Sequence, residues 1–270
     1  MSDADAPIRL DVAFTPAALG AHGPDAWTTY IAVDVIRATT TLCVLFEGGC
    51  RRVLLAPDIA AARTARDALG PEWLLAGEVG GARPPGFDFG NSPAEFSTAE
   101  LDGRQLIFAT SNGTVALRAC LGGRAVLAGS LRNVSAVAAA ALASLSVATD
   151  QPADSPAVVV VCAGRDRLPA PDDTICAGYL IRCLREVVRA SVHTAALGEH
   201  AQEALTLMEQ AEQGSGLRAA LTGSAAAQDI RRIGLEGDLD WCVAVDATIV
   251  VPRVTGSLAG HDLLIVEATK

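Results

Sequence analysis

Hydrophobic positions along this chain form short apolar runs that alternate with longer segments of helical periodicity. Short runs rich in β-branched residues are typical of buried strands, and helices commonly end at glycine. The runs predict strands at 9–14, 30–35, 53–56, 73–76, 106–109, 125–128 and 157–161. Helical patterns then continue from residue 172 to about residue 242, and two closing strands are predicted at 248–251 and 263–266.

This alternation predicts an α/β protein, with a layered α/β/α architecture and a mostly parallel or mixed sheet. Two stretches, 39–56 and 110–128, share one order of elements: a threonine-rich start, a short helix, Gly-Gly, an arginine and a strand. That order fits two similar α/β subdomains or the ordinary repetition of βα units. We expect an N-terminal half, 1–150, with most polar motifs, and a helix-rich C-terminal half, 151–270, packed against it; one continuous domain is the alternative.

Composition limits the class of protein. Half of the 270 residues are hydrophobic and 19% are charged, as in a globular protein with a substantial core. The acidic start Met1–Asp5 does not resemble a secretory signal, and no apolar stretch predicts a membrane span. The seven cysteines form no C-x-x-C pair, which favours reduced thiols over disulfides or a zinc site and predicts a cytoplasmic location.

Charge narrows the choice of partner. The chain has 21 basic and 31 acidic residues, a formal net charge of −10. Because nucleic-acid affinity depends on neutralising phosphates, we expect no nucleic-acid partner. A small anionic substrate fits if a divalent cation supplies positive charge locally. The alanine-rich composition would also permit a homodimer.

The most informative motif directly follows the strand predicted at 30–35. Asp34 stands at the strand's carboxyl end, Arg37 follows, and Thr39, Thr40 and Thr41 open a helix. Hydroxyl and amide donors at a helix start favour an anion. One cap needs only one hydroxyl, so we favour anion binding, although a capping threonine with an Asp–Arg pair that fixes a turn is the alternative.

A second segment of this kind follows the strand at 106–109. Ser111, Asn112, Gly113 and Thr114 place small donors and a permissive glycine at a helix start. Alone this segment would be an ordinary capped helix. Beside the first motif it becomes a second candidate for phosphate binding.

The stretch 77–93 has no periodicity and is rich in glycine and proline, which is typical of a functional loop. Glu78 follows a strand directly and is a plausible Mg²⁺ ligand, because Mg²⁺ takes oxygen ligands with few carboxylates. Asn91 and Ser92 are candidate substrate contacts, whereas Asp88 fits a turn better.

Two features further along are ambiguous. Asp172 and Asp173 begin a helix, where acidic residues interact favourably with the helix dipole. We interpret Asp172 as a plain cap, and Asp173 as a candidate metal ligand. Cys162 ends a strand, but the loop after it lacks the arginine spacing of cysteine phosphatases, so we expect an inert thiol. No P-loop or dinucleotide-binding glycine motif is present in the sequence.

Several blocks resemble, in order, the 2-phosphosulfolactate phosphatase family. They are 34–42 (DVIRATTTL), 77–96 (GEVGGARPPGFDFGNSPAEF), 110–117 (TSNGTVAL), 129–137 (GSLRNVSAV) and 161–178 (VCAGRDRLPAPDDTICAG), with a weaker block at 224–246. The resemblance implies a Mg²⁺-dependent acid phosphatase that converts (2R)-2-phospho-3-sulfolactate to 3-sulfolactate and phosphate, a step of coenzyme M biosynthesis in methanogens. This chain departs from the family in Asp172–Asp173, where a Glu-Asp pair is expected, and in the prolines of 165–171.

With the resemblance, the motifs define a hypothetical site. Asp34, helped by Glu78 and Asp173, would hold Mg²⁺, or Asp34 would itself attack phosphorus. Arg37 and the donors at 39–41 and 111–114 would hold the phosphate. Arg132 would bind the sulfonate, and Asn133, Asn91 and Ser92 complete the candidate substrate contacts. The same loops would also suit a phosphatase of another small phosphoester or a non-catalytic sensor of a phosphorylated metabolite.

Overall fold

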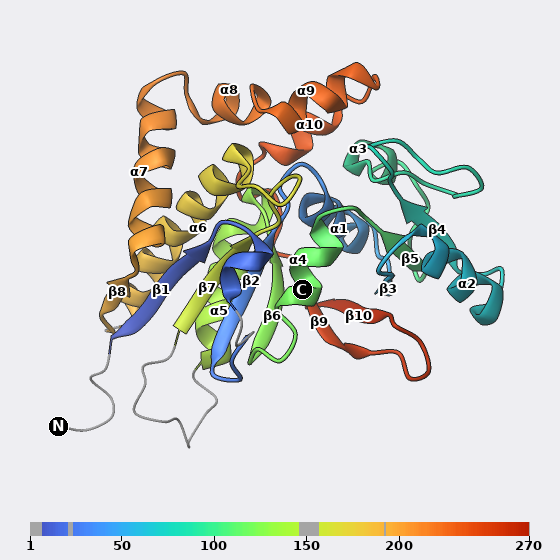
Figure 1. Cartoon of the computed structure of the whole chain (residues 1–270), viewed down its shortest axis with the longest axis horizontal. Helices are drawn as coiled ribbons and strands as arrows, with labels where there is room; N and C mark the ends of the chain where they lie inside the picture. The colour runs from blue at the N-terminus through green and yellow to red at the C-terminus, as the bar shows by residue number, and fades with distance from the viewer. Residues whose placement is uncertain (1–6, 21–23, 146–156, 192, 270) are drawn as a thin grey trace.

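The computed structural model describes residues 7–20, 24–145, 157–191 and 193–269. Met1–Asp5 and the stretch before the strand predicted at 157–161 lie outside these ranges. Within them the chain folds around one ten-stranded mixed sheet, ordered β4-β5-β3-β10-β9-β6-β2-β7-β1-β8 (Figure 1). The strands are β1 (Ile8–Ala13), β2 (Thr28–Val33), β3 (Arg52–Leu55), β4 (Leu74–Gly77), β5 (Gln105–Ala109), β6 (Ala125–Gly129), β7 (Ala157–Cys162), β8 (Ala195–Leu197), β9 (Val251–Ser257) and β10 (Leu264–Thr269).

Helices of very different length connect these strands. The α-helices are α1 (Ala38–Glu47), α2 (Ile59–Leu69), α3 (Pro93–Phe96), α4 (Gly113–Ala119), α5 (Val134–Leu145), α6 (Pro171–Ala190), α7 (Glu199–Gln213), α8 (Leu217–Thr222), α9 (Ala225–Arg232) and α10 (Asp238–Cys242). Two short 3₁₀ helices are η2 (Pro16–Leu19) and η3 (Leu131–Asn133).

The sheet consists of two parallel segments joined by an antiparallel hairpin. One segment is β4-β5-β3, the other is β6-β2-β7-β1-β8, and β9 and β10 lie between them. The contacts β3–β10, β10–β9 and β9–β6 are all antiparallel, so the two segments run in opposite directions. Strands that precede residue 150 and strands that follow it are interleaved in this sheet, so the boundary expected near residue 150 does not separate two sheets.

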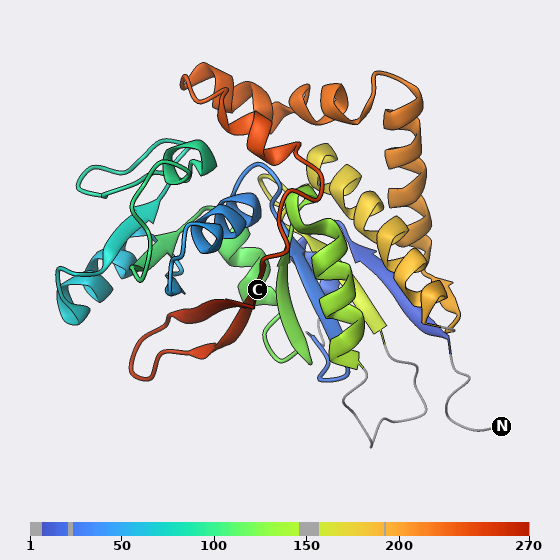
Figure 2. The same cartoon turned by 180° about the vertical axis from the view of Figure 1, so that it is seen from behind.

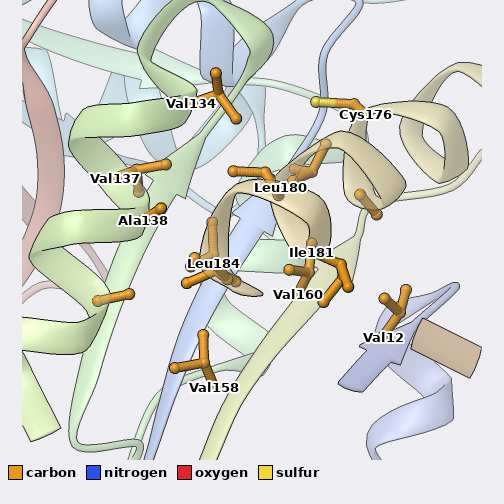
Figure 3. Packing of buried hydrophobic residues seen from close by; sticks show 14 of the residues in the cluster. Val12, Val134, Val137, Ala138, Val158, Val160, Cys176, Leu180, Ile181 and Leu184 are labelled. Atoms are coloured by element: carbon orange, nitrogen blue, oxygen red, sulfur yellow. The ribbon is translucent and has the colours of Figure 1, made fainter. Parts of the chain in front are cut away.

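Both faces of the sheet are covered, which confirms the expected α/β layering. On β2, Ile31 and Val33 pack in the core beneath α5, α6 and α7, whereas Tyr30 and Ala32 pack in the core that includes α1 and α4. A strand buried on both faces needs apolar residues at every position, which explains its uninterrupted apolar run. Figure 2 shows the first of these faces, and Figure 3 shows Val134, Val137 and Leu180 of its core.

The structure differs from the predicted elements at the C-terminal end. β8 was not predicted, because a three-residue edge strand carries little periodicity. Residues 248–250 are not a strand: the Asp246 and Thr248 amides donate instead to the carbonyls of η3. The strand starts at Val251 and continues into an exposed hairpin. None of the helices within the described ranges is long and apolar enough to cross a bilayer.

Candidate active site

A cavity of about 360 Å³ lies where the carboxyl ends of the two parallel segments approach each other. Asp34 follows β2 and Arg165 follows β7, while Glu78 follows β4 and Ser111 follows β5 closely. Helix α9 contributes the remaining side. The lining residues are Asp34, Ile36, Arg37, Glu78, Gly80, Gly81, Asn91, Ser111, Asn112, Arg165, Asp166, Ala226, Asp229 and Ile230. Ligands of open α/β proteins bind at this type of edge.

Asp34 lies between the starts of two crossover helices. Helix α1 leads from β2 to β3 and α4 leads from β5 to β6, so each helix passes from one parallel segment to the other. Their first turns touch at Gly113, where a side-chain Cβ would lie 2.9 Å from Asp34 Oδ2 and would collide with Ala38. The Ala38 amide approaches Asp34 Oδ1 at 3.4 Å. Glycine at position 113 thus permits the close approach on which the cavity depends.

The Asp34 carboxyl has an unusual acidity. Burial, reinforced by the nearby charge of Glu78, raises the pKa of Asp34 from 3.8 to about 7. A cation beside the carboxylate would offset both effects and keep it ionised at neutral pH.

Arg37 is fixed in the wall of the cavity. Its guanidinium forms an ion pair with Asp238, Nη1 to Oδ2 at 2.6 Å, and donates from Nη2 to the Gly81 carbonyl at 2.6 Å. Asp238 also accepts hydrogen bonds from the Ser92 hydroxyl and the Ala94 amide. Both partners of the ion pair are buried. Through these bonds the network joins the start of α1, the 77–93 loop and α10.

Glu78 organises the loops on the opposite side. Its Oε1 accepts the Ser111 amide at 2.7 Å and its Oε2 accepts the Gly81 amide at 2.8 Å. The side chain therefore positions the start of α4 and the 77–93 loop against each other, while facing the cavity.

The threonine motif mainly supports the backbone. Thr39 Oγ1 donates to the Asp34 carbonyl at 2.9 Å and Thr40 Oγ1 to the Val35 carbonyl at 2.9 Å. Thr41 is fully buried, and within the described residues its hydroxyl has no hydrogen-bond partner. Thr114 contacts the Thr110 hydroxyl at 3.1 Å. None of these hydroxyls lines the cavity, and no side chain caps α1, so the contacts support neither phosphate binding by these hydroxyls nor the capping alternative.

Asp173 lies behind the cavity and connects two loops. Its Oδ1 accepts the Val35 amide at 2.9 Å and its Oδ2 the Gly164 amide at 3.0 Å. Burial, together with the charges of Asp172 and Asp34, raises the pKa of Asp173 well above its usual range. Burial likewise raises the pKa of Asp172 to about 6. Because both oxygens of Asp173 already bind backbone amides, its contacts favour a positioning role over direct metal ligation.

The 77–93 loop contributes one unsatisfied acceptor. Asn91 is buried at the cavity, and its Oδ1 is without a hydrogen-bond partner in the described part of the chain. Ser92 faces a neighbouring cavity of about 540 Å³ and donates to Asp238. Asp88 accepts the Leu75 amide at 2.7 Å and pairs with Arg66, as a turn-forming residue would.

Arg132 and Asn133 lie outside the cavity. The Arg132 guanidinium forms two 2.7 Å hydrogen bonds with the carboxylate of Glu47 and stacks over Trp241. Asn133 caps η3 and donates to the carbonyls of Ala128 and Val250. These contacts hold η3 in the fold and leave no support for the expected contacts with substrate.

Cys162 is buried at the end of β7. Burial and the neighbouring Asp173 raise the pKa of its thiol well above the usual range. A protonated, enclosed thiol is a poor nucleophile, which agrees with the expectation of an inert residue.

Sequence reasoning missed the part of the site formed by Arg165, Asp229 and Asp238. Arg165 stands just after a strand, as Asp34 and Glu78 do, and that position was its available signal. Asp229 and Asp238 belong to short helices of the C-terminal region. Their roles depend on long-range ion pairs that no local pattern reveals.

The described residues contain no group of three or more His, Cys, Asp or Glu side chains arranged to hold a metal ion. Mg²⁺ does not require such a group, since it often takes one or two carboxylates and completes its octahedron with water and phosphate. The Asp34 carboxylate and the unsatisfied Asn91 Oδ1 offer two oxygen donors in one cavity. A donor set of this kind would suit Mg²⁺.

An α/β sheet with an oxygen-rich cavity at the carboxyl ends of parallel strands is typical of proteins that bind a small polar ligand. The family model described as 2-phosphosulpholactate phosphatase matches residues 14–257. The chain belongs to the 2-phosphosulfolactate phosphatase family, as the sequence motifs predicted.

Curated relatives agree with this assignment. A probable 2-phosphosulfolactate phosphatase of Deinococcus radiodurans is 35% identical over 249 residues, which cover 92% of this chain and 93% of the relative. A protein of the same description from Thermus thermophilus is 36% identical over 230 residues, covering 84% and 87% of the two chains. A third, from Symbiobacterium thermophilum, is 33% identical over 227 residues, covering 83% and 90%.

Proposed function

We propose that this chain is a Mg²⁺-dependent phosphatase that hydrolyses (2R)-2-phospho-3-sulfolactate to 3-sulfolactate and phosphate. Family membership supports the reaction. The charge of the cavity supports the cation: four carboxylates, of Asp34, Glu78, Asp166 and Asp229, face only two guanidinium groups. An anionic substrate would be repelled from this cavity unless a cation entered with it.

In this proposal Asp34 and Asn91 hold Mg²⁺, which when bound neutralises phosphate charge and polarises a non-bridging oxygen. Ser111 and Asn112 line the cavity, and the Ser111 hydroxyl and the Asn112 side-chain amide would donate hydrogen bonds to the phosphate. Glu78 fixes the backbone that carries Ser111, and Arg37 fixes the opposite wall. These groups are held before substrate arrives, which favours the charge distribution of the transition state.

The test is phosphate release from 2-phosphosulfolactate with Mg²⁺ and with EDTA, for the wild type, Asp34→Asn and Asn91→Ala. We expect turnover that requires Mg²⁺ and falls by at least about 100-fold in Asp34→Asn. Near-normal turnover of Asp34→Asn would eliminate the proposed site. A phosphorylated Asp34 peptide after acid quenching would assign Asp34 as the nucleophile instead.

The substrate and the cation are tested separately. Mg²⁺-dependent turnover of other small phosphoesters, without 2-phosphosulfolactate, would keep the chemistry and change the substrate. Tight binding without turnover would indicate a sensor of phosphorylated metabolites. Thermal stabilisation by Mg²⁺ alone, lost in Asp34→Asn, reports on the metal site independently of activity.

A further inference from the structure

The two arginines that line the cavity differ in whether they are free to bind substrate. The side chains of Arg37 and its partner Asp238 are 2% and 1% exposed, so releasing Arg37 would leave a buried carboxylate without its ion pair. Arg165 pairs with Asp229 and, at 3.6 Å, with the exposed Asp166 beside it; the side chains of Arg165 and Asp229 are 40% and 30% exposed. Exposed ion pairs are weak and exchange readily. Arg165 is therefore the guanidinium that an anion in this cavity can recruit.

Asp229 can also lose Arg165 without being left unpaired. It forms a second ion pair, with Arg232, one turn further along α9. An anionic ligand that attracts Arg165 consequently leaves Asp229 paired with Arg232. This three-residue arrangement allows an arginine to change partners at little cost.

The backbone that carries Arg165 is held in place. The amide and carbonyl of Arg165 pair with those of Leu168, at 2.9 and 2.8 Å, across a two-residue turn. Both turn residues, Asp166 and Arg167, have positive φ, which is typical of a tight hairpin turn. At the root of the turn, Gly164 donates its amide to Asp173. A flexible side chain on a fixed backbone suits exchange between an internal carboxylate and a ligand.

We propose that Arg165 binds the sulfonate of 2-phosphosulfolactate, exchanging Asp229 for it, and so determines substrate specificity. This inference rests on the function proposed above. The cation at Asp34 and the donors of Ser111 and Asn112 account for the phosphate, which leaves two further anionic groups, the carboxylate and the sulfonate. Only the sulfonate distinguishes this ester from 2-phospholactate, and it stays ionised at every working pH. Its tetrahedral oxygens match the donor fork of a guanidinium. Arg132, the residue expected for this role from the sequence, is bound to Glu47 outside the cavity.

The experiment compares kcat/KM for 2-phosphosulfolactate and for 2-phospholactate, in which hydrogen replaces the sulfonate. Wild type should prefer the sulfonated ester, and Arg165→Gln should reduce that preference by about 10- to 100-fold, mainly through KM. Arg165→Lys should restore part of it. Arg167→Gln is the matched control, because it removes the same charge from the same turn but lies outside the cavity lining. Its preference should equal that of the wild type.

Asp229→Asn provides a readout that a merely structural role would not give. Removing the competing carboxylate should lower KM for 2-phosphosulfolactate severalfold, the opposite direction to Arg165→Gln. Equal losses on both esters in Arg165→Gln, or a wild type without preference, would overturn the assignment while leaving the phosphatase function intact. Absence of phosphate release from either ester with wild-type enzyme would instead reject the proposed function, and the assignment with it.

Discussion

Replacing Asp34 with asparagine should stabilise the metal-free protein while it removes activity. Asp34 is buried, lies near other carboxylates, and has a pKa raised to about 7. Without a cation, the folded protein must either keep this charge in an unfavourable position or bind a proton. Asparagine fills nearly the same volume and has no charge to bury.

The sign and size of the stability change follow from the protonation of Asp34 in the folded and the unfolded protein. The pKa of Asp34 is about 7 in the folded protein against the ordinary aspartate value of 3.8. Between these values the folded state binds more protons than the unfolded state, so the free energy of unfolding falls as pH rises. A difference of about three pH units corresponds to at most about 4 kcal/mol at about 1.4 kcal/mol per unit.

The assay is urea denaturation in EDTA at about pH 5 and about pH 8.5. Asp34→Asn should gain stability relative to the wild type, and the gain should be larger at the higher pH. Asp67→Asn removes an exposed carboxylate from α2 and serves as the matched control. A variant that is less stable than the wild type at about pH 8.5, with the same difference at both pH values, would refute the burial argument.

Other substitutions test the supporting structure. Asp238→Asn should cost about 3 kcal/mol or more, measured by urea denaturation, because it removes the partner of a buried arginine. Arg132→Gln should lower the free energy of unfolding by about 1–3 kcal/mol yet change kcat/KM less than about twofold. A larger loss of activity that is confined to sulfonated esters would restore the substrate role of Arg132. Gly113→Ala should reduce both stability, by about 1–3 kcal/mol, and turnover, because its methyl would approach Asp34. Gly256→Ala, where a Cβ meets no atom within 4 Å, is its control.

The sequence predicted the positions of the main cavity residues through strand ends. Asp34, Glu78 and Ser111 all stand within two residues of an apolar run, and the carboxyl ends of parallel strands converge on ligands. The structure gathers these three residues, with Arg37, in one cavity. The loop after β6, which carries the candidate substrate contacts Arg132 and Asn133, does not line this cavity.

The role of each polar side chain was harder to predict. A threonine hydroxyl at a helix start donates equally well to a phosphate or to a backbone carbonyl, and Thr39 and Thr40 use carbonyls. Arg132 looked available because its partner, Glu47, lies 85 positions earlier in the chain. Arg165 and Asp229 were missed for the same reason. Motif chemistry narrows the candidates, but tertiary pairing decides which donors remain free.

The direction of the strands explains why structural and site residues share motifs. Because the two parallel segments run in opposite directions, their carboxyl ends would lie at opposite edges of a flat sheet, and they line one cavity only if the sheet turns at the β9–β10 join. Helices α1 and α4 cross this join. Asn133 donates hydrogen bonds to a carbonyl near the end of β6 and to a carbonyl just before β9, and so links these two strands. Polar residues near the strand ends therefore divide into two groups. Those facing the cavity can bind the ligand, while Arg132 ties η3 to α1, Asn133 ties it to the approach to β9, and Thr39 and Thr40 hold the turn into α1.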